Sequence, residues 1–296
     1  MRGSLLFLVL FLASAATAGC SGTQLLNTLT PSGGYRQATG ITFDVPHRLT
    51  LDIYTPVSAR GAPVVVFFYG GRWTSGTTAD FHFVGQALAS QGFVAIVPEY
   101  RHYPVARFPA FVQDAARAVR WAETQAERYG GDPRKLFVMG HSSGAHLAAM
   151  LALAPEFLAE AGGDRDRLKG MIGLAGPYDF LPLVDADLRD MFGPPERYEL
   201  SQPIAHVDGQ NPPLLLLHGE DDQTVRVRNT RNLAERVHSA GGPVEAFFYP
   251  EMSHSWILAT LAAPLRGRSD VLNRVGDFVR DRAVNSPSSL VPEKPR

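Results

Sequence analysis

The chain has 296 residues with a formal net charge of −1, and 45% of its residues are hydrophobic. This length leaves room for one large domain, which buries enough surface to fold without metal or disulfide staples. No stretch gathers Lys and Arg into a basic block, so the composition argues against nucleic acid as a partner.

The first 19 residues have the order of a secretory signal peptide. Arg2 precedes an apolar run over residues 5–12, and small residues follow over 13–19. The apolar run is too short to span a bilayer as a permanent helix. We therefore predict that the protein is exported.

The single cysteine of the chain, Cys20, comes directly after the small residues. Thr17-Ala18-Gly19-Cys20 resembles a bacterial lipobox, in which the cysteine is lipidated, although Thr17 stands where Leu is usual. Ala16-Thr17-Ala18 also matches an ordinary A-x-A cleavage site. The sequence favours a cell-envelope lipoprotein anchored at Cys20 and leaves a periplasmic or secreted protein as the alternative. That anchor is the only membrane contact we expect.

The rest of the chain divides into three parts. Residues 20–40 are rich in Gly, Ser and Thr without periodicity, which predicts a tether. Residues 41–284 predict a single domain. Residues 285–296 carry three prolines and two adjacent serines, which predicts a flexible tail.

The domain alternates short β-branched runs with longer amphipathic stretches. Residues 41–45 and 49–54 alternate apolar and polar side chains, as the strands of an antiparallel edge hairpin do. Continuous apolar runs, typical of strands covered on both faces, follow at 64–69, 93–97, 136–139, 171–174, 214–217 and 244–248. The stretches expected as helices lie at 79–90, 111–129, 144–153, 226–240 and 270–282. This order predicts an α/β fold, with a mostly parallel central sheet, an antiparallel N-terminal hairpin and helices on both faces.

A candidate nucleophile lies between a predicted strand and a predicted helix. Gly140-His141-Ser142-Ser143-Gly144 fits the pattern G-x-S-x-G, and this strand–turn–helix setting is that of a nucleophile elbow. Glycines at both ends let the strand and the helix approach closely. Ser143 is a rival nucleophile, but its place in the pattern favours a backbone N–H that binds an oxyanion. A plain turn with a helix-capping serine is the structural alternative.

A candidate acid follows the predicted strand 214–217. The run His218-Gly219-Glu220-Asp221-Asp222-Gln223-Thr224-Val225 contains H-G-x-x-D-x-x-V, which favours Asp222. Glu220 and Asp221 are alternatives, and three acids in a loop are also typical of a solvated surface. An orienting carboxylate of this kind is what a histidine base needs.

His254 is the best candidate for the base, because it follows the last predicted core strand. One helix and one strand separate it from Asp222, as the chain order Ser–acid–His requires. We interpret His218 and His141 as loop residues beside the site, and His146 as a satisfied helix residue. The sequence has no H-E-x-x-H pattern, so we expect neither a metal nor a cofactor.

A candidate oxyanion hole follows the predicted strand 64–69. In Tyr69-Gly70-Gly71-Arg72-Trp73, the glycines leave backbone N–H groups open to a developing negative charge. We expect the donors to be the N–H groups of Gly71, Arg72 and Ser143. His is usual at the first position of this pattern, and Tyr69 replaces it here. A plain glycine turn is the alternative.

These motifs resemble the carboxylesterase and feruloyl-esterase-like branch of the α/β-hydrolases, close to the hormone-sensitive-lipase type. The resemblance spans residues 41 to 283 and is carried by the elbow together with 69–73, 98–101 and 131–136. It implies a serine carboxylic-ester hydrolase that transfers the acyl group of a small or aryl ester through Ser142, His254 and Asp222. Side chains that could line its substrate pocket, or equally pack in the core, are Trp73, Phe81, Phe180 and Trp256.

Two alternatives to an esterase remain open. The elbow and Gly176-Pro177-Tyr178-Asp179 are also similar to kynurenine formamidase, which cleaves an N-formyl amide. The predicted export signal argues against that cytosolic activity. From another class, the chain could be a noncatalytic binding member of the same fold, and Tyr69 is the one residue that favours it.

Overall fold

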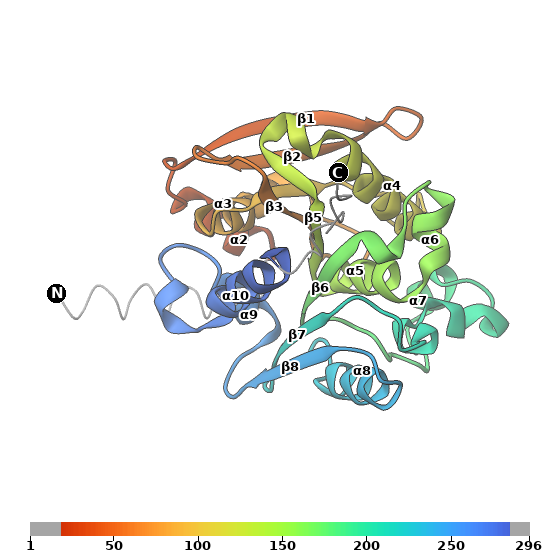
Figure 1. Ribbon diagram of the computed structural model, residues 1–296. Coiled ribbons are helices and arrows are strands. Elements are labelled where there is room, and N and C mark those ends of the chain that lie inside the picture. Colours follow the sequence, from red (N-terminus) through yellow and green to blue (C-terminus); the bar gives the residue numbers. More distant parts are fainter. Residues whose placement is uncertain (1–18, 285–296) are drawn as a thin grey trace, which may run out of the picture.

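A computed structural model describes residues 19–284, so the predicted tail over 285–296 and all but the last residue of the predicted signal peptide over 1–19 lie outside the described residues. The domain is built on one eight-stranded sheet with the strand order β1-β2-β4-β3-β5-β6-β7-β8 (Figure 1). The strands are β1 (Tyr35–Asp44), β2 (Leu49–Pro56), β3 (Ala62–Phe68), β4 (Val94–Pro98), β5 (Gly131–His141), β6 (Leu168–Leu174), β7 (Leu214–Gly219) and β8 (Val244–Tyr249).

Strand direction in the sheet confirms the predicted α/β architecture. β1 pairs antiparallel with β2, and β2 pairs antiparallel with β4. All the remaining pairs, from β4–β3 to β7–β8, are parallel. The carboxyl ends of β3, β5 and β7 therefore meet at one edge of the sheet, which is where ligands bind in such folds.

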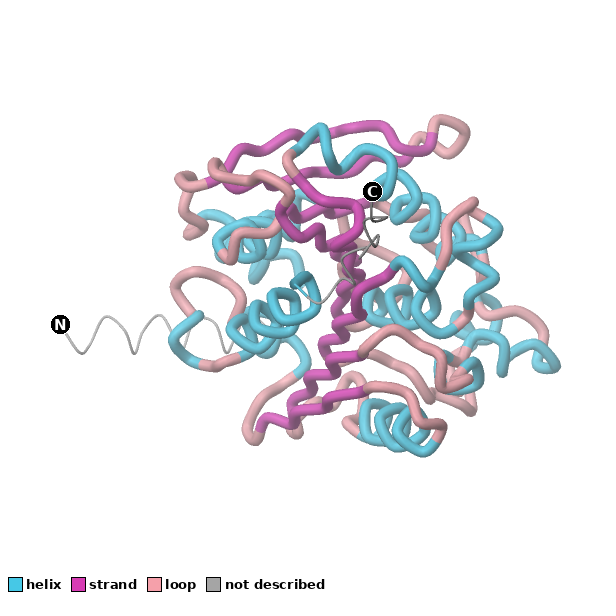
Figure 2. Tube along the Cα trace, in the orientation of Figure 1, coloured by secondary structure: helices cyan, strands magenta, loops and turns pink. Residues whose placement is uncertain are grey.

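Helices cover both faces of the sheet (Figure 2). α3 (His82–Ser90) and α10 (Val271–Val284) lie on one face, and α4 (Ala110–Gln125), α5 (Ser143–Leu153) and α8 (Arg228–Ser239) lie on the other (Figure 1). β3 and β7 are buried along nearly their whole length, because both of their faces are covered. No helix of residues 19–284 combines the length and the apolar character needed to cross a bilayer.

The structure differs from the tether expected over residues 20–40. Helix α2 (Gly19–Thr28) docks on the domain, with Leu26 only 6% exposed. The Asn27 amide donates to the carbonyls of Ala79 and Asp80 and accepts from the N–H of Phe83. These bonds satisfy backbone groups at the start of α3, so the domain begins before residue 41.

Strand β1 also begins earlier than the alternation of side chains indicates. It starts at Tyr35, and its register against β2 shifts between Ala38 and Ile41. Gly40 lies at this bulge with φ +66. An irregularity of this kind breaks the period of two on which a strand prediction depends.

Three short helices have no counterpart among the predicted elements. They are α6 (Pro155–Glu160), α7 (Ala186–Met191) and α9 (His254–Ala259). Each has six residues, which is too short to show a helical period. Two of them matter for the site, because α7 contacts the loop after β3 and α9 begins at His254.

Candidate active site

Ser142 lies in a sharp turn between β5 and α5, with φ 54 and ψ −126. A positive φ is strained for a residue with a side chain, and strain of this kind marks functional turns. Close approach explains the flanking glycines. A Cβ on Gly140 would lie 2.2 Å from the carbonyl of Gly144, and one on Gly144 would lie 2.0 Å from the carbonyl of Phe68. The turn thus has the geometry of a nucleophile elbow.

Ser142, His254 and Asp222 form one continuous chain of hydrogen bonds. The Oγ atom of Ser142 lies 2.9 Å from Nε2 of His254, and Nδ1 of His254 lies 2.7 Å from Oδ2 of Asp222. A carboxylate can only accept, so Nδ1 carries the proton and Nε2 is free to accept the serine proton. The three residues come from the ends of β5, β7 and β8, which the sheet brings to one edge.

The two alternative acids, Glu220 and Asp221, do not take part in this chain of hydrogen bonds. Glu220 and Asp221 are exposed, and Glu220 pairs with Arg231 at 2.6 Å. Asp222 is only 2% exposed, which makes it the carboxylate in contact with His254.

Hydrogen bonds hold Asp222 at both oxygens. Oδ1 accepts from the N–H groups of Thr224 and Val225, each at 2.8 Å. Oδ2 faces His254 and also Nε2 of His218, at 3.2 Å. Burial alone would raise the pKa of this carboxyl, but the bonds from His218 and His254 outweigh burial and hold the pKa below its ordinary value. Asp222 therefore stays ionised.

His218 does more than pack the loop. It is fully buried, its Nδ1 lies 2.6 Å from Oγ1 of Thr230, and its Nε2 lies 2.9 Å from the carbonyl of Val225. The ring thus ties the loop that carries Asp222 to helix α8. Its spacing of four residues from Asp222 was the only sequence signal for this contact.

The loop after β3 brings unpaired backbone donors beside the serine. A Cβ on Gly70 would lie 2.9 Å from Cβ of Ser142, which shows how closely the two backbones approach. Within residues 19–284, the N–H groups of Gly71 and Arg72 donate to no acceptor. Ser143 is the first residue of α5, where an N–H has no partner inside the helix. These three donors are available to a ligand oxygen, as the oxyanion-hole prediction requires.

The backbone of that loop is strained. Gly71 has φ 147, and a Cβ there would lie 2.0 Å from the carbonyl of Ser75. Arg72 and Trp73 follow with φ 56 and 58. The Arg72 guanidinium pairs with Asp185 at 2.8 Å and with Asp187 at 2.9 Å, next to and within α7. Contacts from a distant segment therefore help to hold the strained loop.

Tyr69 anchors the loop through the core. Its ring is fully buried and stacks on Phe81 at 5.1 Å and on Tyr100 at 4.9 Å. The Tyr100 hydroxyl donates to the Tyr69 carbonyl at 3.0 Å, and the Tyr69 hydroxyl lies 3.5 Å from Nε2 of His102. Burial raises the pKa of Tyr69 well above its ordinary value, so the phenol stays neutral. The tyrosine acts on the loop by packing.

The four aromatic residues expected along the pocket fall into two pairs. Trp73 and Phe81 are 4% and 7% exposed and pack in the core cluster, which is the alternative that the sequence left open for them. Trp73 is enclosed by Phe111, His146, Phe180 and Phe192. Phe180 and Trp256 are partly exposed and remain predicted pocket residues.

His146 lies in the same aromatic cluster as Trp73. Its Nε2 lies 2.8 Å from the Ser201 carbonyl, and the side chain is fully buried. Burial lowers its pKa to about 4. His146 is a neutral core residue on a helix, as the sequence indicates, but it is only partly satisfied, because its buried Nδ1 has no hydrogen-bond partner among residues 19–284.

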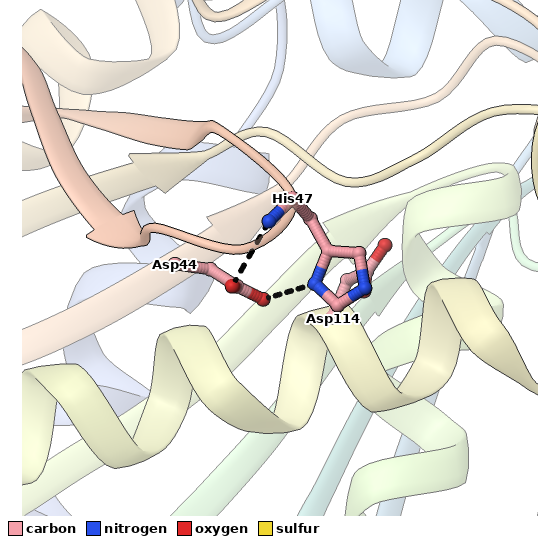
Figure 3. Close-up of side chains that lie close together, drawn as sticks. All are labelled: Asp44, His47 and Asp114. Atoms are coloured by element: carbon pink, nitrogen blue, oxygen red, sulfur yellow. Dashed lines mark hydrogen bonds and ion pairs between the residues drawn. The ribbon is translucent and has the colours of Figure 1, made fainter.

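Asp44, His47 and Asp114 form a separate cluster that includes none of the site residues (Figure 3). Asp44 lies 2.9 Å from Nδ1 of His47 and 2.5 Å from Nε of Arg117. Asp114 binds the Arg101 guanidinium at 2.7 Å and also pairs with Arg117. Two guanidinium groups already neutralise the carboxylates, so the cluster is an ion-pair network that does not fit a cation.

Comparison with known proteins shows the family of this chain. A family model described as BD-FAE matches residues 51–237. The chain belongs to the BD-FAE family. Its sheet and its helices are those of the α/β-hydrolase fold.

Relatives of this BD-FAE chain are named as esterases. Esterase LipC of Mycobacterium tuberculosis is 31% identical over 66% of this chain and 53% of its own length. Isoprenylcysteine alpha-carbonyl methylesterase ICME of Arabidopsis thaliana is 28% identical over 76% of this chain and 57% of its own length. The BD-FAE chain thus spans little more than half the length of these relatives.

Two solved structures superimpose on most of this chain. A carbohydrate esterase from gut microbiota superimposes with a TM-score of 0.74 at 20% identity, over 86% of this chain and 99% of its own. Thermogutta terrifontis esterase 2 superimposes with a TM-score of 0.70 at 25% identity, over 87% of this chain and 98% of its own. The BD-FAE chain shares the fold of both.

Proposed function

We propose that the protein is a serine carboxylic-ester hydrolase in which Ser142 is the nucleophile, His254 the base and Asp222 the orienting acid. The hydrogen-bond chain from Ser142 through His254 to Asp222, at the tip of a strained elbow, carries this proposal. A binding member of the fold has no use for such a chain.

The reaction proceeds in two steps. His254 Nε2 takes the proton of Ser142 as Oγ attacks the ester carbonyl. The oxyanion accepts hydrogen bonds from the N–H groups of Gly71, Arg72 and Ser143, each worth roughly a hundredfold or more in rate. His254 returns the proton to the leaving alcohol. Water, activated by the same imidazole, then releases the acid and restores Ser142.

Asp222 supports both steps through its hydrogen bond to His254. Its ionised carboxylate keeps the proton on Nδ1 of His254 and stabilises the imidazolium that forms at each transfer. The N–H groups of Thr224 and Val225 fix its orientation.

The substrate we propose is a small or aryl ester. Structures of Thermogutta terrifontis esterase 2 are described as butyrate-bound, propionate-bound, phosphoramylated by tabun and phosphonylated by sarin. Short acyl groups and reaction with organophosphates are the properties we transfer to this chain, with Ser142 as the residue that we expect to react.

The test is a panel of p-nitrophenyl esters of increasing acyl length, with N-formylkynurenine beside them, on wild type and Ser142→Ala. We expect hydrolysis of the short esters, lost in Ser142→Ala, and a fluorophosphonate probe found by mass spectrometry on Ser142. Cleavage of the formamide alone would overturn the substrate class. Ester hydrolysis that survives in Ser142→Ala would remove the nucleophile.

We also propose export and lipidation at Cys20. The support is the signal-like order of residues 1–19 and the lipobox-like Thr17-Ala18-Gly19-Cys20. Mass spectrometry of the mature protein should find a lipid on an N-terminal Cys20. A mature chain that begins at Gly19 without lipid would contradict the anchor.

A further inference from the structure

His141 is a buried histidine in direct contact with the proposed base. It precedes Ser142 at the end of β5 and is 6% exposed. Its Nε2 lies 3.0 Å from the backbone carbonyl of His254, and the centroids of the two rings are 4.8 Å apart. The reaction described above gives this side chain no role.

The direction of the bond follows from its partner. A carbonyl oxygen can only accept, so Nε2 of His141 carries the proton and donates it. The other ring nitrogen, Nδ1, lies on the side of the oxyanion loop, because a Cβ on Gly70 would come within 3.0 Å of it. One ring thus bonds to the backbone of the base and lies close to Gly70 of the loop that supplies the oxyanion donors.

His254 has little local support of its own. It is the first residue of α9, which has only six residues. Ser253 occupies the N-cap position, but its side chain makes no capping bond. A helix of one to two turns is marginal unless other contacts hold it. The bond from His141 is such a contact, and it acts on the backbone of His254 itself.

We propose that His141 is a positioning residue: its Nε2–H, bonded to the His254 carbonyl, holds the His254 imidazole in line with Ser142 and the oxyanion loop. This inference rests on the proposed function. Misplacing a reacting group by about 1 Å can cost roughly a hundredfold in rate. A bond to the backbone limits such movement without competing for either ring nitrogen of His254.

The charge state of His141 suits this role. Burial, and then the neighbouring His254, lower its pKa to about 3, against smaller opposing effects of the His254 carbonyl and Asp222. A neutral ring adds no repulsion when His254 becomes a cation during proton transfer. Nδ1 of His141 then keeps a lone pair beside the oxyanion loop.

The experiment compares three substitutions at His141 by their kinetics on the ester that wild type hydrolyses best. The Gln side chain reaches about as far as Nε2 and keeps a donor there. Asn carries the same amide on a shorter stem, and Met fills similar space without a donor. We expect kcat to fall by about tenfold to a hundredfold in His141→Asn and His141→Met, and His141→Gln to retain most of it. KM should change little, because the substrate contacts remain.

Two further measurements distinguish a loss of positioning from a loss of folding. Thermal unfolding confirms that each variant is folded, and the low-field proton signal of the His254 Nδ1–H reports the bond to Asp222. That signal should shift or broaden in the Asn and Met variants and persist in Gln. Equal losses of kcat in His141→Gln and His141→Met would overturn the positioning role. A wild-type kcat in His141→Met would overturn it as well.

The proposed function is tested separately by Ser142→Ala in the same assay. If Ser142→Ala is inactive while His141→Met matches wild type, the esterase proposal stands and the positioning role is wrong. If Ser142→Ala is as active as wild type, the triad itself is wrong.

Discussion

Nε2 of His218 lies 3.2 Å from Oδ2 of Asp222, and both side chains are completely buried. The same oxygen receives the Nδ1–H of His254 at 2.7 Å. Asp222 is thus enclosed between two histidines, and the adjacent Asp221 points into solvent. Two neighbouring residues of the same type therefore have different expected effects on activity.

Asp222→Asn should lower kcat by about a thousandfold to ten-thousandfold. The amide group can donate to His254 Nδ1 and so selects the tautomer that cannot accept the serine proton. Asp221→Asn is the matched control and should stay close to wild type, because Asp221 is exposed. Steady-state kinetics on a short p-nitrophenyl ester measures both. Loss of kcat in the Asp221 variant alone would move the acid to residue 221.

Ser142→Gly should be more stable than Ser142→Ala by about 1 kcal/mol, the reverse of the usual order for these two residues. Both variants lack the hydroxyl, so they differ in backbone freedom. At φ 54, alanine keeps the strain of the elbow and glycine releases it. Urea unfolding of the two variants gives the difference. A more stable alanine variant would show that the elbow is not strained.

The free energy of unfolding should fall as the pH drops from about 6.5 towards 4. The pKa of His146 lies at about 4 in the folded protein and near its ordinary value of 6.5 in the unfolded chain. Between these values the unfolded chain binds a proton that the folded protein does not, so acid favours unfolding. His141, with a pKa of about 3, acts in the same direction.

His146→Gln removes the titrating imidazole of His146 and keeps an N–H donor for the Ser201 carbonyl. Its unfolding free energy should depend less steeply on pH over that range, by up to about 1.4 kcal/mol per pH unit. Urea unfolding at a series of pH values checks the slope. An unchanged slope would mean that His146 is protonated in the folded protein.

Asp114→Ala should destabilise the protein by about 3 kcal/mol, because it removes the buried acceptor of Arg101 and leaves Arg117 with Asp44 as its one remaining buried partner. Asp190→Ala removes an exposed ion pair with Arg107 and should have a much smaller effect. Urea unfolding of the two variants measures the difference.

Dialysis against a chelator should change neither the melting temperature nor the activity, because guanidinium groups occupy the carboxylates of the Asp44–His47–Asp114 cluster. A melting temperature that falls after chelation and recovers with added Zn²⁺ would contradict this assignment.

Local patterns in the sequence were enough to predict that the strands exist and in which order they follow, although not where β1 begins, and to single out Ser142 as the candidate nucleophile. The continuous apolar runs of β3, β5 and β7 indicate strands covered on both faces. The G-x-S-x-G motif has meaning through its immediate neighbours, a strand before it and a helix after it. Apolar runs and the neighbours of a motif are local features of the sequence, so they can be recognised without the tertiary structure.

Other features depend on which segments the fold brings together. Leu26 and Asn27 look like part of a linker, yet they dock on the start of α3, more than 50 residues away. Trp73 and Phe81 look equally suited to a pocket and to a core, and their neighbours in space place them in the core. Burial is decided by distant residues, so no local period reveals it.

The sequence by itself determined the types and the order of the proposed catalytic residues: a serine on an elbow, then an acid cluster, then a histidine. Only the tertiary structure decided which acid faces His254, where the rings of His218 and His141 lie, and that Tyr69 holds its loop by stacking. The reason is physical. Parallel strands bring the ends of β3, β5, β7 and β8 to one edge of the sheet, and hydrogen bonds of 2.7 and 2.9 Å then connect residues 32 and 112 positions apart.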